Sequence, residues 1–384
     1  MFITVLATLS LLIWIYLLAG RGGFWRVAKQ LKHAGNSHDM PLRRVVVVIP
    51  ARNEAEVIGR SLTSLFSQHY PSLLDVFLVD DSSTDGTAEL ARATAHALGR
   101  GANLTIIKGE SLPSGWTGKM WAVSQGVAAA GARTPDYLLL ADADILHGPD
   151  SLAELVKIAE SGGYDLASYM VTLACVTPAE KALIPAFVFF FLMLYPPAWI
   201  QSRKLRTAAA AGGCILIRPE ALKRMGGIAA IRTKVIDDCA LARGVKSAGG
   251  RIWMGLTHES RSIRSYETFG EIGRMISRTA FNQLHHSTLL LVATIIGLSV
   301  TYLLPPCVLF SSKTLPITLG ATAWALMAAC YYPMVRFYRR SFLWSFTLPA
   351  VALFYLIATV HSAIQYWRGV GGSWKGRAQD LRKS

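Results

Sequence analysis

The sequence is poor in charged residues, and in acidic residues most of all. Only 16% of its 384 residues are charged, whereas a typical soluble domain has about 25%, and 52% are hydrophobic. This composition excludes a wholly soluble protein. It also excludes a mainly disordered chain, because disorder requires low hydrophobicity and high charge. The length leaves room for one domain of about 250 residues and several membrane segments.

Cysteine is scarce as well. The chain has 5 cysteines and no Cys-x-x-Cys pair, which excludes a disulfide framework and a zinc site and fits a reducing compartment. The few acids leave a net charge of +15, which indicates either nucleic acid or an anionic membrane surface as a partner. Apolar segments flanked by basic residues favour the membrane. The chain shows no compact basic helix and no aromatic RNA-binding strand, so we expect no nucleic-acid partner.

The N-terminus begins with an uncharged apolar run over residues 2–19. Its length is close to the roughly 20 residues that span a bilayer. Lys and Arg follow the run and none precedes it, which predicts an uncleaved anchor with the N-terminus outside and the next segment in the cytoplasm. A cleaved signal peptide is the alternative.

Three more apolar runs lie near residues 288–310, 315–335 and 343–366. Arg336, Arg339 and Arg340 should lie in the cytoplasm, and the loop near Lys313 outside. Three full crossings would then put the basic tail outside, against the charge rule. Either the last run is a re-entrant hairpin bent near Pro349 or the charge rule fails here, and we favour a cytoplasmic tail.

These segments predict a multi-pass protein of the inner membrane. The expected parts are an anchor (1–20), a basic linker (21–42), a cytoplasmic domain (43–284), a transmembrane region (285–367) and a basic tail (368–384). The apolar stretch 183–200 contains prolines and precedes a basic cluster, Arg203, Lys204 and Arg206. It is therefore expected to lie in the membrane interface rather than to cross.

Within residues 43–282, strand patterns alternate with helix patterns. The runs RRVVVVIPARNE, LLDVFLVDDSS, LTIIKG and YLLLADAD are typical of buried strands, and helical patterns lie between them. This alternation predicts an α/β fold with a mostly parallel sheet and helices on both faces. Ligands bind such sheets beyond the carboxyl ends of the strands.

Polar side chains follow these strands directly. The strand ends carry Asn53 and Glu54, then Asp80 and Asp81, then Asp142 and Asp144. Parallel strands with right-handed crossovers bring these ends to one edge, where carboxylates would repel each other unless a cation were bound. Oxygen ligands and an Asp-x-Asp pattern suit Mg²⁺ or Mn²⁺ shared with substrate phosphates.

These motifs together resemble the family 2 glycosyltransferases with the GT-A fold. The matching segments are VVIPARNE (47–54), VDDSSTDGT (79–87), DAD (142–144), GGC (212–214) and DDCALA (237–242). The resemblance implies that Asp142 and Asp144 hold the metal and that Asp238 is the catalytic base. The implied nucleotide-sugar residues are Pro50, Asn53, Glu54, Asp80, Asp81 and Asp142. The implied acceptor side comprises Gly212, Gly213, Cys214 and Asp237, where Asp237 replaces a glutamate usual in the family.

Three of these assignments have alternatives. Lys119, at an expected helix start in GWTGK (115–119), would bind phosphate or be a solvated lysine. Arg274, near the place of a Gln-x-x-Arg-Trp motif in processive relatives, would contact diphosphate or face anionic lipid, as would Arg278. Asp238 would act as the base or cap the helix that follows it.

The N-terminal anchor, GWTGK, GGC, RTAFNQL (278–284) and WKGR (374–377) resemble the hopanoid-biosynthesis (hopene-associated) subgroup of membrane glycosyltransferases. The resemblance implies an inverting enzyme that moves a sugar from a nucleotide diphosphate sugar, with UDP favoured, to a lipid acceptor at the bilayer. A polyprenyl-phosphate glycosyltransferase is one alternative, with the basic cluster at 203–206 as its phosphate site. An inactive membrane scaffold is the alternative of another class.

Overall fold

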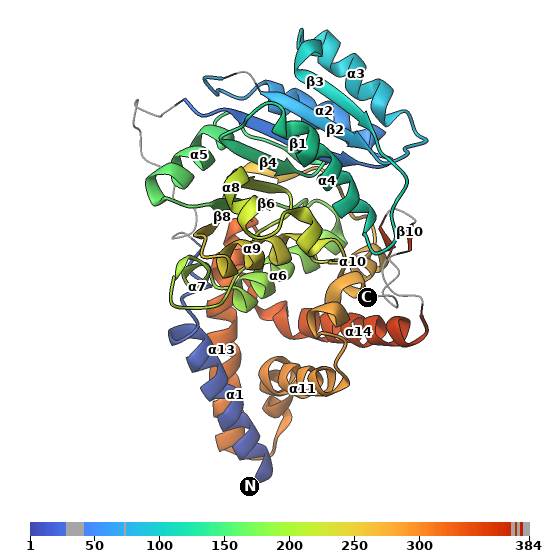
Figure 1. Cartoon of the computed structure of the whole chain (residues 1–384). Coiled ribbons are helices and arrows are strands. Elements are labelled where there is room, and N and C mark those ends of the chain that lie inside the picture. Colours follow the sequence, from blue (N-terminus) through green and yellow to red (C-terminus); the bar gives the residue numbers. More distant parts are fainter. Residues whose placement is uncertain (28–41, 73, 370–372, 375–376, 379–384) are drawn as a thin grey trace. The chain divides into compact units, whose positions relative to one another are not determined.

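A computed structural model describes residues 1–27, 42–72, 74–369, 373–374 and 377–378. The chain forms two compact units, whose elements are labelled in Figure 1. The sheet unit comprises Gln30–Ala174, Trp199–Arg264 and Ser373–Ser384, and the helical unit comprises Met1–Lys29, Cys175–Ala198 and Ser265–Gly372. Most of the expected basic linker and of the expected basic tail, including Lys375 and Gly376 of WKGR, lies outside the described residues.

The sheet unit is built on one mixed sheet. Its strands are β1 (Val45–Ala51), β2 (Asp75–Asp80), β3 (Leu104–Lys108), β4 (Tyr137–Ala141), β5 (Ile145–Leu146), β6 (Leu166–Thr172), β7 (Cys214–Ile217) and β8 (Ile252–Ser262). They lie in the order β3-β2-β1-β4-β7-β6-β8-β5. Strand β1 is parallel to β2 and β4, β2 is parallel to β3, and β6 is parallel to β8. The expected α/β fold is confirmed, but β7 runs antiparallel to β4 and β6, and β5 runs antiparallel to β8.

Helices cover both faces of this sheet. They are α2 (Ala55–Phe66), α3 (Thr87–Ala97), η2 (Gly101–Asn103), α4 (Gly118–Gly131), α5 (Ser151–Gly162), α8 (Pro219–Arg224), η3 (Ile228–Ile231) and α9 (Asp237–Ser247). All seven residues of β1 are buried. Val45, Val47 and Ile49 share a core with α2 and α5, whereas Val48 faces α4. The unbroken apolar run in β1 therefore reflects a strand covered on both faces.

Helix α4 lies unusually close to the sheet. A Cβ atom at Gly126 would lie 2.5 Å from Cγ1 of Val48 and 3.0 Å from Cγ2 of Val79. Only glycine allows this approach without displacement of the two valines. The helix starts at Gly118, so this packing brings its first turn, with Lys119, toward the ends of β1 and β4.

The helical unit contains the long apolar segments. Its elements are α1 (Phe2–Ala19), α6 (Pro178–Leu194), α10 (Phe269–Gln283), α11 (Thr288–Leu298), the π-helical η4 (Ser299–Leu303), α12 (Leu304–Cys307), η5 (Val308–Phe310), α13 (Thr314–Phe337), η6 (Phe342–Thr347) and α14 (Leu348–Trp367). The short α7 (Pro197–Gln201) crosses the boundary between the units. Among the described residues, five segments are long and apolar enough to cross a membrane: Phe2–Ala19, Pro178–Gln201, Thr288–Phe310, Thr314–Phe337 and Phe342–Trp367.

The segment expected at the interface, 183–200, is mostly helix α6. This helix starts with a capping box between Thr177 and Glu180 and continues through Pro185. It ends before the prolines at 196 and 197, which agrees with their inability to extend a helix. Of its apolar window 56% is buried within the protein, compared with 17% for α1. Helix α6 is therefore largely enclosed by protein.

Helices α10 and α14 lie side by side and run parallel. The rings of Phe269 and Phe354 are 6.3 Å apart at one end. In the middle, Oγ of Ser277 donates a 3.0 Å hydrogen bond to the carbonyl of Ala358, and further on the backbone N–H of Phe281 donates to Oγ of Ser362. The step of four residues from Ser277 to Phe281 in α10 matches the step from Ala358 to Ser362 in α14. Helix α10 belongs to the helical unit, although it lies within the residues expected to form the cytoplasmic domain (43–284).

Candidate functional site

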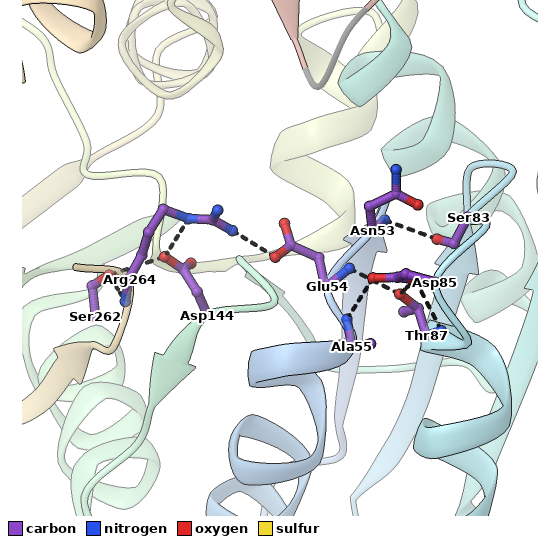
Figure 2. A network of polar contacts seen from close by, with 9 residues as sticks. All are labelled: Asn53, Glu54, Ala55, Ser83, Asp85, Thr87, Asp144, Ser262 and Arg264. Atoms are coloured by element: carbon purple, nitrogen blue, oxygen red, sulfur yellow. Dashed lines mark hydrogen bonds and ion pairs between the residues drawn. The ribbon is translucent and has the colours of Figure 1, made fainter. Parts of the chain in front are cut away.

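The turn after β1 is joined to the turn after β2 by hydrogen bonds. Asn53 has a φ of 52°, in the left-handed region that asparagine tolerates better than most residues. Its backbone N–H donates to Oγ of Ser83, and its Oδ1 accepts from the N–H of Thr84. Asn53 therefore fixes one turn against the other, as Figure 2 shows for its contact with Ser83.

The two aspartates after β2 have different surroundings. Oδ1 of Asp80 accepts a 2.9 Å hydrogen bond from the N–H of Ser83 and so closes the turn. Asp81 is only 3% exposed, and its Oδ2 lies 3.6 Å from Nη1 of Arg52. The same Arg52 atom donates to the Asp81 carbonyl oxygen over 2.5 Å. Asp80 and Asp81, predicted as nucleotide contacts, thus form an acidic turn beside the end of β1.

The DAD segment follows the buried strand β4. Ala143 is 3% exposed, whereas the carboxylates on either side of it keep 34% (Asp142) and 14% (Asp144) exposure. Burial raises the pKa of Asp142; Lys119 lowers it, and Asp144 and Asp237 raise it further. The net direction is upward, and burial is the largest cause.

Lys119 connects the DAD segment to α9. Its helix is capped by Thr117, whose Oγ1 accepts from the N–H of Met120. Nζ of Lys119 lies 2.9 Å from Oδ1 of Asp142 and 3.0 Å from Oδ2 of Asp237. Burial lowers the pKa of Lys119, but these two carboxylates more than offset it and raise the pKa above its usual range. Lys119 is therefore a charged bridge, not a solvated lysine.

Asp238 occupies the first turn of α9. Its Oδ2 accepts a 3.0 Å hydrogen bond from the N–H of Gly212, and its Oδ1 accepts one of 2.6 Å from the N–H of Cys239. Burial, followed by the neighbouring Asp237, raises the pKa of Asp238 to about 7. A carboxylate with this pKa and a fixed orientation suits proton abstraction near neutral pH.

The GGC segment lies beside Asp238. A Cβ atom at Gly212 would lie 3.5 Å from Oδ2 of Asp238 and 3.7 Å from Nζ of Lys119. At Gly213 it would lie 3.0 Å from Cδ1 of Ile145. Cys214 is buried in β7 within the sheet core, and burial raises the pKa of its thiol to about 12. Cys214 therefore has the place of a small core residue, and Gly212 is the member of this segment that borders the acidic group.

A small cavity is lined by several of these residues together. Its lining includes Pro50, Lys119, Asp142, Gly212, Asp237 and Asp238. The remaining predicted site residue, Arg274, belongs to the helical unit, where it is exposed on α10. The sheet unit thus brings together the residues predicted for metal, base and acceptor.

Arg264 is a member of this site that the sequence analysis missed. Its Nη2 donates to Oε2 of Glu54 over 2.5 Å, and its Nε donates to Oδ2 of Asp144 over 3.3 Å. Oγ of Ser262 donates to the same Asp144 oxygen over 2.9 Å. Figure 2 shows Arg264 extended between the two carboxylates. The signal available in the sequence was an arginine two residues after a long strand, β8, that ends near the DAD segment.

The carboxylates fit a hard divalent cation. Asp142 and Asp144 supply oxygen ligands, and their side chains keep 34% and 14% exposure. Within the described residues no group of three or more His, Cys, Asp or Glu side chains is arranged to hold a metal. A cation here would therefore share its coordination with a ligand such as a diphosphate, as Mg²⁺ commonly does.

Part of the chain is similar to known glycosyltransferases. Residues 46–226 match glycosyl transferase family 2. An uncharacterized protein from Methanocaldococcus jannaschii is 31% identical over 123 residues, which are 32% of this chain and 44% of that protein. The 4,4'-diaponeurosporenoate glycosyltransferase of Staphylococcus aureus (strain USA300) is 34% identical over 103 residues, which are 27% of this chain and 24% of that protein. The chain thus spans less than half the length of these curated relatives.

A solved structure shares the fold over most of the chain. The mannosyltransferase PcManGT from Pyrobaculum calidifontis, in complex with GDP-Man and Mn²⁺, has a TM-score of 0.54 at 19% sequence identity. The likeness covers 92% of this chain and 99% of that one. Residues 46–226 thus match glycosyl transferase family 2, and the mixed sheet together with this likeness shows a GT-A-like fold.

Proposed function

We propose that this protein is a membrane-bound, inverting glycosyltransferase that moves a sugar from a nucleotide diphosphate sugar to a lipid acceptor. The observation that carries the proposal is the convergence of Asp142, Asp237 and Asp238 around Lys119, with Asp144 next to Asp142. Such an excess of carboxylates is costly unless a ligand compensates it. A metal-bound diphosphate is the ligand that the family 2 domain supports.

In this proposal the acceptor hydroxyl attacks the anomeric carbon of the donor. The new C–O bond forms as the bond to the diphosphate breaks, and Asp238 takes the hydroxyl proton. The hydrogen bonds from Gly212 and Cys239 hold the carboxylate in one orientation, and its pKa of about 7 suits this transfer. No covalent intermediate on the protein is needed.

The donor would lie between the acidic turn after β2 and the DAD segment. Asp80, Asp81 and Asn53 would contact the nucleotide, while Asp142 and Asp144 would hold Mg²⁺ or Mn²⁺. The bound cation would supply charge neutralisation for the departing diphosphate. PcManGT, solved with GDP-Man and Mn²⁺, supports a donor and cofactor of this kind. UDP is our first choice of nucleotide, and a test with both UDP and GDP decides it.

The apolar helices support a membrane location with the catalytic domain in the cytoplasm. Residues 21–26 after α1 contain two arginines, and three arginines follow or end α13 at positions 336, 339 and 340. An excess of positive charge marks the cytoplasmic side. On this basis α1 crosses the membrane from the outside to the cytoplasm. The segment 288–310 then crosses to the outside, and α13 returns the chain to the cytoplasm.

Helix α14 would then lie in the membrane interface. It is unbroken from Leu348 to Trp367, with Pro349 in its first turn, so the hairpin bend considered near Pro349 does not occur. Its parallel partner α10 exposes Arg274 and Arg278. If α14 crossed the bilayer, both arginines would enter the hydrocarbon at a cost of about 3 kcal/mol or more each. In Figure 1, α14 runs across the direction of α13, as an interfacial helix would.

For the acceptor we propose a hopanoid or a related membrane lipid. The support is the resemblance of GWTGK, GGC and RTAFNQL to the hopene-associated subgroup, and a relative named for the acceptor 4,4'-diaponeurosporenoate. A second candidate is a polyprenyl-phosphate acceptor, favoured by one observation. Arg203, Lys204 and Arg206 are all exposed in the short segment after α7, where they could bind a phosphate.

A lipid assay tests the proposal. Membranes from cells that express the full chain, wild type or Asp238→Asn, would be incubated with a panel of UDP- and GDP-sugars and Mn²⁺. Mass spectrometry should show a lipid that gains one glycosyl unit only with wild type and one donor, and EDTA should abolish it. A glycosylated polyprenyl phosphate would select the second candidate. No glycosylated lipid with any donor, or equal product from Asp238→Asn, would overturn the proposal.

A further inference from the structure

Each carboxylate of the DAD segment is bound to a cationic side chain of the protein. Lys119 joins Asp142 to Asp237, with 2.9 and 3.0 Å between the paired atoms. Arg264 joins Asp144 to Glu54, with 3.3 and 2.5 Å (Figure 2). Each cation thus links the DAD segment to a carboxylate on another element, at the start of α9 in one case and before α2 in the other.

These pairs occupy one oxygen atom of each carboxylate that could bind a metal ion. Oδ1 of Asp142 faces the Lys119 ammonium, and Oδ2 of Asp144 faces the Arg264 guanidinium. A divalent cation on the same carboxylates would place two positive charges beside each of these groups. Like charges at such distances repel strongly in a partly buried site. Metal binding alone is therefore opposed by the protein's own cations.

A diphosphate changes this balance. It carries negative oxygens that accept hydrogen bonds from ammonium and guanidinium groups, and arginine binds phosphate in a two-pronged manner. Both side chains have room to move, because Lys119 is 21% and Arg264 is 36% exposed. Once Lys119 and Arg264 have left the DAD carboxylates, they could therefore bind the diphosphate that arrives with the metal.

We propose that Lys119 and Arg264 are internal counter-cations, which hold the DAD carboxylates in the free enzyme and are displaced together by a metal–diphosphate pair. This inference depends on the proposed function, since it assumes a nucleotide diphosphate ligand. Joint displacement means that the metal raises the affinity for the nucleotide and that the nucleotide raises the affinity for the metal. By linkage, both affinities rise by the same factor. Lys119 and Arg264 act here as positioning residues for the metal ligands.

The test measures Mn²⁺ affinity of the purified full chain in detergent, by titration calorimetry, alone and with saturating UDP or GDP. Arg264→Gln and Lys119→Met should bind Mn²⁺ alone about tenfold more tightly than wild type, because the competing charge is gone. The same variants should lose about tenfold of the coupling between Mn²⁺ and the nucleotide, within the usual range of such couplings. Arg264→Lys, which keeps the charge, should retain much of the coupling.

Matched controls separate this effect from a general change of charge. Arg261→Gln removes an exposed arginine from the same strand end, and Lys223→Met removes an exposed lysine from α8. Both should behave as wild type. Circular dichroism and thermal unfolding would confirm that each variant is folded, and Lys119→Met carries the test if Arg264→Gln is not folded.

Two outcomes count against the idea in different ways. If Mn²⁺ alone binds the variants no more tightly and the coupling persists, the counter-cation role is wrong while the proposed donor stands. If wild type binds neither UDP nor GDP with Mn²⁺ present, the proposed function fails and this inference fails with it.

Discussion

The backbone N–H of Gly212 donates a 3.0 Å hydrogen bond to Oδ2 of Asp238. Because Cys239 donates to the other oxygen, both oxygens of this carboxylate are oriented by the main chain. A side chain held in this way keeps its position when its charge is removed, since an amide oxygen can accept the same hydrogen bond. Asparagine is therefore an informative replacement at this position.

Asp238→Asn should lower kcat by roughly 10²- to 10⁴-fold, the usual contribution of a general base. Nucleotide binding should change little, because the carboxylate is assigned to the acceptor proton and not to the donor. Turnover with the identified donor and calorimetric binding of the nucleotide with Mn²⁺ would measure both effects. The matched control is Asp150→Asn, which replaces an exposed aspartate before α5 and should leave both turnover and nucleotide binding unchanged. A near-normal rate in Asp238→Asn would show that another group acts as the base.

His147 makes the stability of the sheet unit sensitive to pH. It is 6% exposed, and its Nε2 has no hydrogen-bond partner among the described residues. Burial lowers its pKa from about 6.5 to about 4. The unfolded chain therefore takes up the proton first as the pH falls, so the stabilisation is complete above pH 6.5 and is lost toward pH 4. The expected loss at pH 5 is about 2 kcal/mol of unfolding free energy.

The measurement is thermal unfolding of the detergent-solubilised chain at pH 7.5 and pH 5. The drop in Tm between these two pH values should be smaller for His147→Gln than for wild type. His69→Gln, whose side chain is 71% exposed, should show the wild-type drop. Equal pH dependence in all three proteins would mean that His147 is protonated, or solvated, in the folded state.

Gly126 allows α4 to approach the sheet, which makes it sensitive to a single methyl group. Alanine is the better helix former by about 1 kcal/mol. At Gly126, however, the new Cβ would lie 2.5 Å from Val48, a fully buried side chain on a central strand that cannot move away cheaply. Overpacking of this kind costs about 1–3 kcal/mol, so Gly126→Ala should lower Tm.

Gly131, at the end of the same helix, provides the control. A Cβ atom there would meet nothing within 4 Å, so Gly131→Ala should leave Tm unchanged or raise it slightly. Gly126→Ala should also weaken nucleotide binding, since the shift of α4 would move Lys119 away from Asp142. If both alanine variants stabilise the protein equally, α4 is not held against β1 as closely as the structure indicates.

Local patterns in the sequence were sufficient for the strands and helices up to β4. Each strand there is a short β-branched or apolar run with polar residues at its end, and the structure confirms β1, β2, β3 and β4. The antiparallel insertion of β7 could not be predicted in the same way. Its four residues are apolar on both faces, so neither its direction nor its neighbours leave a mark in the sequence.

The candidate site was predictable where its residues directly follow a strand or start a helix. Asp142, Asp144, Lys119 and Asp238 have such positions, and the sheet brings them together. Arg264 was missed because its role depends on a long-range contact with Glu54, 210 residues away in the chain. Separations of that size leave no local periodicity, and arginines are common after strands without any such role.

The membrane arrangement can be tested by labelling single cysteines from outside intact cells. After replacement of the exposed Cys307 by serine, one cysteine would be placed at Ser312, Ser341 or Ser384. Ser312 follows the segment 288–310, so an impermeant maleimide should label it in intact cells. Ser341, before η6, and Ser384, at the end of the tail, should be labelled only after lysis.

The comparison of Ser341 with Ser384 decides the position of α14. The two sites flank this helix, and its packing against α10 requires them to be on the same side, because a crossing would carry Arg274 and Arg278 into the hydrocarbon. Labelling of Ser384 but not Ser341 in intact cells would show that α14 crosses. In that case α10 could not stay packed along its whole length in the membrane-bound protein, and the basic tail would break the charge rule that the other segments obey.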